Sequence, residues 1–283
     1  MTDLQMLGFC RWSYPAAPGA FQKDAGDTLE EIRAALYAPE RLELRLFYLE
    51  HVLIPCLLGQ TDGDFTLLML MGEGLPEPYR ARLLALIAPV PQIVPRFLPE
   101  GLPHQQVCIE QMLAARRQGI AAVGEFRIDD DDAVAVDFIE RCRQQFALLR
   151  PFFEDEGKLV IDYNRGYLLR TEPGRLDVQP VVARYWNCGM VIFLPADSDQ
   201  TTLNFHHARM WMRLAMISWP RAAMFVRGVH GQNDSTVAEK KHNAGQGRHD
   251  PTEMPDTLRE RFGIDLAVLE RAWMAGPGGR GKG

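Results

Sequence analysis

The sequence predicts an α/β protein whose mixed sheet is flanked by helices and carries an antiparallel C-terminal extension. Strand-like apolar runs alternate with helical patterns as far as residue 146, which is typical of a parallel sheet with right-handed crossovers. Beyond Gly157, short strand-like runs follow one another with turn residues between them, which indicates antiparallel strands. Between these regions, an apolar run at residues 121–126 is followed by four consecutive aspartates at 129–132. This pattern of strand, acidic turn and helix places the carboxylates at the carboxyl edge of a sheet, where open α/β folds bind ligands.

Local patterns predict the elements of the first half. Asp27 with Glu30 three residues later resembles a capping box and begins a helix. Pro39 begins a second helix, in which leucines recur on one face until Gly59 ends it. The predicted strands are residues 6–10, 65–71, 92–94 and 121–126, and the remaining helices are 76–87, 104–117 and 133–146.

The second half is predicted to contain shorter elements. Its strands are residues 159–163, 167–170, 178–185, 190–194 and 223–227, with helices at 204–216, 255–262 and 266–274. The polar stretch 239–250 is expected to be mobile, and the Gly-rich tail 276–283 to be disordered. The length of 283 residues suits one large domain, taken as residues 1–275.

Composition excludes several classes of protein. A net charge of −6 argues against nucleic-acid binding, which requires a phosphate-neutralising surface. The apolar runs are too short to span a bilayer, and the amino terminus lacks the pattern of a secretory signal. The five cysteines are scattered without a C-x-x-C pair, which is typical of reduced thiols. We therefore expect a cytoplasmic protein without a transmembrane segment.

The aspartate run itself poses an electrostatic problem. Neighbouring carboxylates about 4 Å apart repel by roughly 4 kcal/mol at an effective dielectric near 20. Such a run is stable if it is solvated or if a cation neutralises it, and both interpretations remain open from the residues alone. The second would be a divalent metal site, Mg²⁺ or Mn²⁺, that carries a diphosphate.

Three groups of segments carry a family resemblance. Residues 54–68 resemble the helix–"QT"–strand signature of family-2 inverting glycosyltransferases, and residues 127–132 stand where those enzymes have a D-x-D metal motif. The whole order of segments, from about residue 5 to 273, is similar to the putative rhamnosyltransferase family. The segments that carry this similarity are 8–15, 37–41, 75–80, 126–137, 162–167 and 233–235.

The resemblance implies a GT-A-type nucleotide-diphospho-sugar transferase fold, with a nucleotide-sugar half (1–132) and an acceptor half with C-terminal helices (133–275). It implies a metal-dependent glycosyltransferase that moves a sugar, rhamnose by the family's name, from a nucleotide-diphosphate donor. The acceptor would be a glycan or a glycolipid, so peripheral membrane contact stays open. Two alternatives also stay open: a degenerate protein that binds sugar nucleotide or glycan without turnover, and a nucleotidyltransferase.

Candidate site residues follow from the resemblance and from the expected sheet edge. Two helical neighbours diverge by roughly 100°, so only one of His206 and His207 is expected to face the site. The late acidic pair that supplies the base in family-2 enzymes is replaced around residues 204–207, which makes His207 and Asp234 the candidate bases. The candidate metal ligands are Asp131, Asp132 and His230. The candidate donor contacts are Arg11, Trp12, Asp62, Glu73, Arg127, Asp129 and Asp130, of which Trp12 could equally be a core residue.

Overall fold

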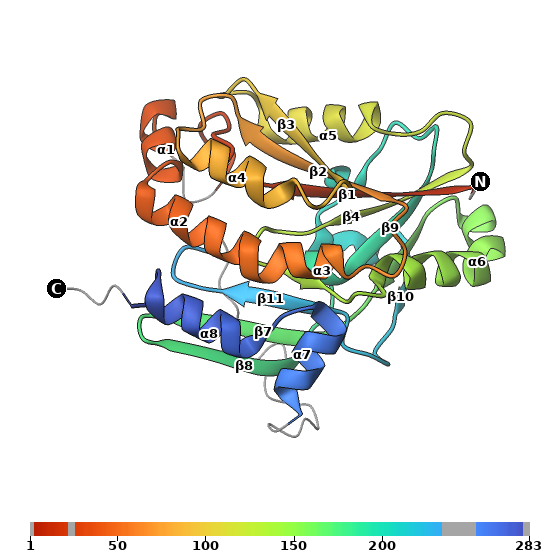
Figure 1. Cartoon of the computed structure of the whole chain (residues 1–283). Coiled ribbons are helices and arrows are strands. Elements are labelled where there is room, and N and C mark those ends of the chain that lie inside the picture. The colour runs from red at the N-terminus through yellow and green to blue at the C-terminus, as the bar shows by residue number, and fades with distance from the viewer. Residues whose placement is uncertain (1–2, 22–25, 234–252, 280–283) are drawn as a thin grey trace.

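The computed structural model describes residues 3–21, 26–233 and 253–279, which form two sheets with helices packed around them (Figure 1). The larger sheet has seven strands in the order β10-β6-β9-β4-β1-β2-β3, and the smaller has four in the order β5-β11-β7-β8. The strands of the larger sheet are β1 (Leu4–Arg11), β2 (Phe65–Gly72), β3 (Ile93–Leu98), β4 (Ala122–Arg127), β6 (Leu159–Asp162), β9 (Met190–Pro195) and β10 (Ala215–Ser218). Those of the smaller sheet are β5 (Ala133–Val134), β7 (Arg165–Glu172), β8 (Arg175–Val182) and β11 (Phe225–Val229). The predicted α/β class with a mixed sheet flanked by helices is confirmed.

The four strands that carry the site run in parallel. β1 pairs with β2 and β4, and β2 pairs with β3, all in the parallel sense. Arg11, Glu73 and Asp129 therefore follow strand ends at the same edge of the sheet. β9 is antiparallel to both β4 and β6, as the predicted extension requires.

Helices cover both faces of the larger sheet. They are α1 (Leu29–Leu36), α2 (Pro39–Tyr48), α3 (Ile54–Leu58), α4 (Tyr79–Ile87), α5 (His104–Ala114) and α6 (Phe138–Glu156), whereas α7 (Met254–Phe262) and α8 (Leu266–Ala275) pack beside the smaller sheet (Figure 1). Alternate residues of β1 point to opposite faces, so Met6 joins the core under α2, α4 and α6 while Leu7 joins the core under α5. All five cysteines are free and buried. No helix in the described ranges combines the length and apolarity needed to cross a membrane.

The helix beside the site continues beyond the end of α2. A π-helical turn (Leu49–Leu53) joins α2 to α3, so residues 39–58 form one continuous helix. Pro39 lies in its first turn. The buried leucines Leu42, Leu46 and Leu53 line its inner side, as predicted. The start of α1 differs by one residue from the prediction, because Thr28 and Glu31 form the capping box.

Three other expectations were wrong. Residues 133–134 do not begin a helix but form β5, because both apolar residues are buried by antiparallel pairing with β11. Residues 204–216 are not one helix; they form short 3-10 helices (Thr202–Asn204 and His207–Met212) followed by β10. The later strands do not all extend one sheet, since β7 pairs with β11 and β8 pairs with β7 in a second sheet. The stretch 239–250 and the last four residues of the tail lie outside the described residues.

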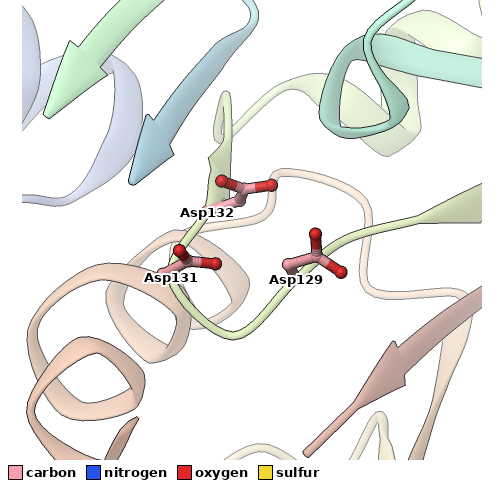
Figure 2. A group of neighbouring side chains, drawn as sticks. All are labelled: Asp129, Asp131 and Asp132. Carbon is pink, nitrogen blue, oxygen red and sulfur yellow. The ribbon is translucent and has the colours of Figure 1, made fainter. Parts of the chain in front are cut away.

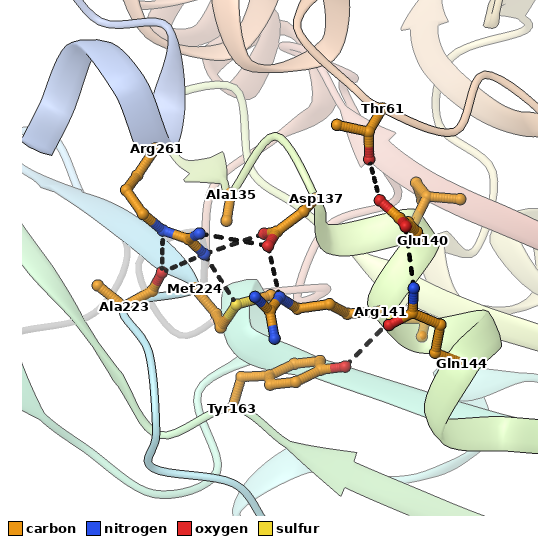
Figure 3. Close-up of polar contacts among 12 residues, drawn as sticks. Thr61, Ala135, Asp137, Glu140, Arg141, Gln144, Tyr163, Ala223, Met224 and Arg261 are labelled. Atoms are coloured by element: carbon orange, nitrogen blue, oxygen red, sulfur yellow. Dashed lines mark hydrogen bonds and ion pairs between the residues drawn. The ribbon is translucent and has the colours of Figure 1, made fainter. Parts of the chain in front are cut away.

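A polar network fixes the chain just beyond the acidic run. Arg261 of α7 contacts Asp137 at the start of α6, with Nη2 2.9 Å from Oδ1, and also donates to the carbonyl of Ala223 ahead of β11 (Figure 3). The Arg261 carbonyl in turn accepts from the amide of Val136 at 2.8 Å. These contacts tie α6, α7 and the segment before β11 together, so the chain that follows the acidic run is held in place.

Candidate functional site

The four aspartates lie between β4 and β5, at the carboxyl edge of the parallel strands. Asp129 is exposed, whereas Asp130, Asp131 and Asp132 are 3%, 3% and 5% exposed. One carboxylate oxygen from each of Asp129, Asp131 and Asp132 lies within 4.8 Å of the others, and the three side chains border a common space (Figure 2). The run is therefore not a solvated turn, since most of its charge is taken out of water.

Asp130 is turned away from this trio toward α2. Its Oδ1 accepts a hydrogen bond from Nη1 of Arg45 at 2.7 Å. Burial raises the pKa of Asp130, even though the Arg45 charge opposes this shift. Asp130 thus anchors the loop to α2.

Asp131 is oriented by two residues that follow β11. Its Oδ2 accepts from Nε2 of His230 at 3.0 Å and from Nδ2 of Asn233 at 2.7 Å. Burial opposes ionisation of Asp131, but these hydrogen bonds and the Arg45 charge outweigh it and lower its pKa to about 2. Asp131 is therefore a carboxylate at neutral pH.

His230 orients Asp131 through a hydrogen bond. Its Nδ1 accepts from the amide of Gln232 at 3.1 Å, so the ring proton resides on Nε2 and is donated to Asp131. Its ring also stacks on Tyr48 of α2, with centroids 4.9 Å apart. Both ring nitrogens are thus engaged with protein groups in this structure, and direct ligation of a metal by His230 stays a prediction.

Burial and the neighbouring aspartates disfavour the charged form of Asp132. Its Oδ1 accepts from the amide of Gly228 at 3.1 Å, yet its pKa is raised by burial and then by the charges of Asp131 and Asp129. A cation among the three would relieve this repulsion, and a donor set made of carboxylate oxygens suits Mg²⁺ or Mn²⁺. The residues present therefore fit a divalent metal.

A small cavity of about 70 Å³ opens beside the aspartates. Arginines share its wall with the acids and come from three different parts of the chain. Such a cavity has room for an ion with its water and an adjoining phosphate, but not for a whole nucleotide sugar. The residues that line it are Arg11, Ser13, Tyr14, Leu36, Arg41, Arg45, Asp129, Asp130, Asp131, Asp132, Arg227, Gly228 and Asn233.

A larger cavity of about 860 Å³ lies on the α5 side of the same sheet edge. Arg127 at the end of β4 lines this cavity and does not line the small one. The segment after β1, the start of α5 and residues 203–207 form its other walls.

His207 is held on the wall of this larger cavity. Its Nδ1 lies 2.6 Å from the carbonyl oxygen of Tyr185; because a carbonyl can only accept, Nδ1 carries the proton and Nε2 keeps its lone pair. Burial lowers the pKa of His207, so the ring is neutral at pH 7. The ring of His206 stacks on it at 5.1 Å and 11°, and both line the cavity; the expected divergence was wrong because the segment is not α-helical there.

The remaining candidates do not join either cavity. Trp12 is fully buried in the apolar core, so its side chain is closed to a ligand. Asp62 precedes β2 and therefore lies at the opposite edge of the sheet, where its Oδ2 is 2.8 Å from Nε of Arg143. Glu73 is exposed beyond the end of β2, at the expected edge, but lines neither cavity. Asp234 lies outside the described residues.

Sequence reasoning found Arg11 but missed the other basic residues of the small cavity. Arg41 and Arg45 are four residues apart and so share one face of α2, a signal that was available. Arg227 and Asn233 come close to the aspartates only because β11 pairs with β5. No local sequence pattern predicts this pairing.

Comparison with solved structures gives distant similarities. A "putative nucleotide-diphospho-sugar transferase" from Desulfovibrio desulfuricans G20 is 13% identical, with 96% of this chain and 98% of that chain covered and a TM-score of 0.39. S. aureus TarS 1-349 in complex with UDP is 11% identical, with 80% of this chain covered and a TM-score of 0.37; the match spans only 60% of that chain. The same protein in complex with UDP-GlcNAc is 12% identical, over 84% of this chain and 63% of that chain, with a TM-score of 0.37.

No curated protein matches the sequence. The family described as "Putative rhamnosyl transferase" matches residues 5–242, which is most of the chain. The chain belongs to this family.

Proposed function

We propose that this protein transfers a sugar, rhamnose by its family's name, from a nucleotide-diphosphate donor to a glycan or glycolipid acceptor, with a divalent metal. The observation that carries the proposal is the trio of Asp129, Asp131 and Asp132 at the carboxyl edge of the parallel strands. The solved structures of TarS with UDP and with UDP-GlcNAc are in keeping with a nucleotide-sugar donor, although they are distant in sequence.

The donor's diphosphate would lie at the small cavity. Asp129, Asp131 and Asp132 would hold the metal, which neutralises the charge that develops on the diphosphate as it leaves. Arg11, with its planar fork of donors, lines the same cavity and suits phosphate oxygens. Arg41 and Arg227 line it as well. His230 and Asn233 keep Asp131 ionised and oriented.

His207 would act as the general base. Transfer requires that the acceptor hydroxyl lose its proton as the oxygen attacks the sugar carbon, and a neutral imidazole with a lone pair on Nε2 can receive it. The hydrogen bond from Nδ1 to the Tyr185 carbonyl fixes that tautomer. His207 would thus serve as the base in place of the late acidic pair of family-2 enzymes.

The metal role is tested by binding as well as by turnover. Asp129 is exposed, so Asp129→Asn removes one ligand without leaving a hole in the core. We expect weaker Mn²⁺ binding by calorimetry and loss of Mn²⁺-dependent hydrolysis of nucleotide-diphosphate sugars. Asp155→Asn, an exposed change on α6, should alter neither.

Two results would count against the proposal. Mn²⁺ affinity equal in wild type and Asp129→Asn would remove the aspartates from the metal site. Donor binding without any product in prolonged incubation with acceptor extracts would instead favour the non-catalytic alternative.

A further inference from the structure

The larger cavity has a one-sided charge. Its described lining contains Arg127 and three histidines, and none of its described lining residues is an aspartate or a glutamate, although the whole chain has a net charge of −6. The three imidazoles belong to His104, His206 and His207. A cavity with this wall favours a ligand that carries negative charge.

The cation of this lining is half-buried at the end of β4. Arg127 lines the cavity, and within the described ranges its guanidinium makes no hydrogen bond or ion pair to another residue. The charge of Arg127 also reaches the neighbouring rings, since it helps to lower the pKa of His104 and of His207. An anion in the cavity would stabilise all three groups together.

The two cavities flank neighbouring strand ends. Phe9 of β1 stands opposite Arg127 of β4, and two residues later Arg11 lines the small cavity. The guanidinium of Arg11 lies 4.0 Å from the ring centroid of Phe21, which lines the large cavity. A ligand in the large cavity would therefore lie next to a diphosphate held at the aspartates.

We propose that the large cavity binds the acceptor and that it selects an acceptor with an anionic group, a carboxylate or a phosphate, near the hydroxyl that reacts. The inference rests on the proposed function. Arg127 holds the anionic group, which assigns it to the acceptor and not to the donor. Phe21 and Phe205 offer apolar surface to the face of a sugar ring.

The test uses three small probes on the full chain. Glucuronic acid carries a carboxylate, glucose 6-phosphate carries a phosphate, and glucose is the uncharged control. Binding is followed by NMR of the histidine Hε1 signals, with His206→Ala and His207→Gln used to assign the rings. We expect the acidic probes to shift the His206 and His207 signals and to raise the pKa of His207, while glucose at the same concentration does neither. The stronger of the two acidic probes identifies the anionic group.

Substitutions locate the contact. Arg127→Met should weaken binding of the stronger acidic probe at least tenfold while leaving the affinity for UDP, GDP and TDP with Mn²⁺ unchanged. His206→Ala, at an exposed position, gives a second variant whose fold is not at risk and should also weaken the probe. Arg175→Met is the control, because that side chain is 69% exposed on β8 and lines neither cavity.

Three results would overturn the inference. Glucose that binds as well as the acidic probes would show that charge is not selected, and acidic probes that leave both rings unshifted at 50 mM (about ten times a weak monosaccharide Kd near 5 mM) would show that the cavity does not hold them. Nucleotides that shift the same rings, compete with the probe and lose affinity in Arg127→Met would assign the cavity to the donor. Because none of these readouts needs turnover, they are independent of the Asp129→Asn experiment.

Discussion

Nη1 of Arg45 lies 2.7 Å from Oδ1 of Asp130 and 3.7 Å from Oδ1 of Asp131. One guanidinium on α2 therefore neutralises the middle of the acidic run from within the protein. This contact divides the four aspartates by role: Asp130 ties the loop to α2, while the carboxylates on either side of it remain available to a cation.

Arg45→Met should destabilise the fold by about 3–5 kcal/mol, because it leaves Asp130 buried without its partner. Denaturant unfolding of the purified chain measures the loss. The double variant Arg45→Met with Asp130→Asn removes both charges and should recover most of it. A double variant as unstable as the sum of the two singles would show that the pair does not interact as described.

Arg116 and Glu125 form a second buried pair, and its loss should be equally costly. Nη2 of Arg116 lies 2.7 Å from Oε1 of Glu125, whose other oxygen accepts from the amide of Thr202. We expect Arg116→Met to cost about 3–5 kcal/mol of unfolding free energy, because the carboxylate inside the sheet loses its cation.

The neighbouring residue supplies a matched control for this change. Arg117 pairs with Asp64 at the surface, with both side chains more than 40% exposed, so Arg117→Met should cost no more than about 1 kcal/mol. Equal losses in the Arg116 and Arg117 variants would contradict the assigned burial.

The acidic run packs so closely against Gly228 that this position has no room for a side chain. A Cβ at this position would come within 2.4 Å of the Asp131 carbonyl oxygen, which is closer than such atoms approach. Gly228→Ala should therefore displace the loop and weaken Mn²⁺ binding measured by calorimetry. Gly231→Ala is the control, because a Cβ there would meet nothing within 4 Å, and it should bind Mn²⁺ like the wild type. If both variants bind Mn²⁺ equally well, the close approach at Gly228 does not matter for metal binding.

Stability should fall in acid because His104 is half-buried in its neutral form. Burial first, and then the charges of Arg11 and Arg127, lower its pKa from 6.5 to about 3. The unfolded chain thus binds a proton between pH 6.5 and 3 that the folded chain does not. The stability contributed by neutral His104 is complete above pH 6.5 and is lost as the pH falls, at up to roughly 1.4 kcal/mol per pH unit.

His104→Gln should flatten this dependence. Thermal or denaturant unfolding from pH 7 to pH 4 measures it, with the exposed His206→Ala as the control that leaves the slope unchanged. An unaltered slope in His104→Gln would mean that other groups account for the acid sensitivity.

The sequence allowed the parallel strands and their common edge to be predicted, because buried strands such as residues 65–71 leave a strong local pattern. It also identified Asp131 and His207 as functional candidates. The partners of those residues were not predictable in the same way, since Asn233 reaches Asp131 across 102 positions of sequence through the pairing of β11 with β5. Residues 204–216 misled for a related reason: their composition suits a helix, but the pairing of β10 with β6 overrides that preference.

If His207 is the base, its substitution should separate chemistry from binding. His207→Gln keeps a polar side chain of similar size but cannot take the acceptor's proton, so kcat should fall about 10²–10⁴-fold while the donor Kd changes little. The wild-type rate should fall on the acid side only below pH 6.5, because burial lowers the pKa of His207 and protonation removes its lone pair. In His207→Gln that acid limb should disappear from the profile of the residual rate. A limb that persists unchanged would assign the proton transfer to another group and leave His207 as a wall of the acceptor cavity.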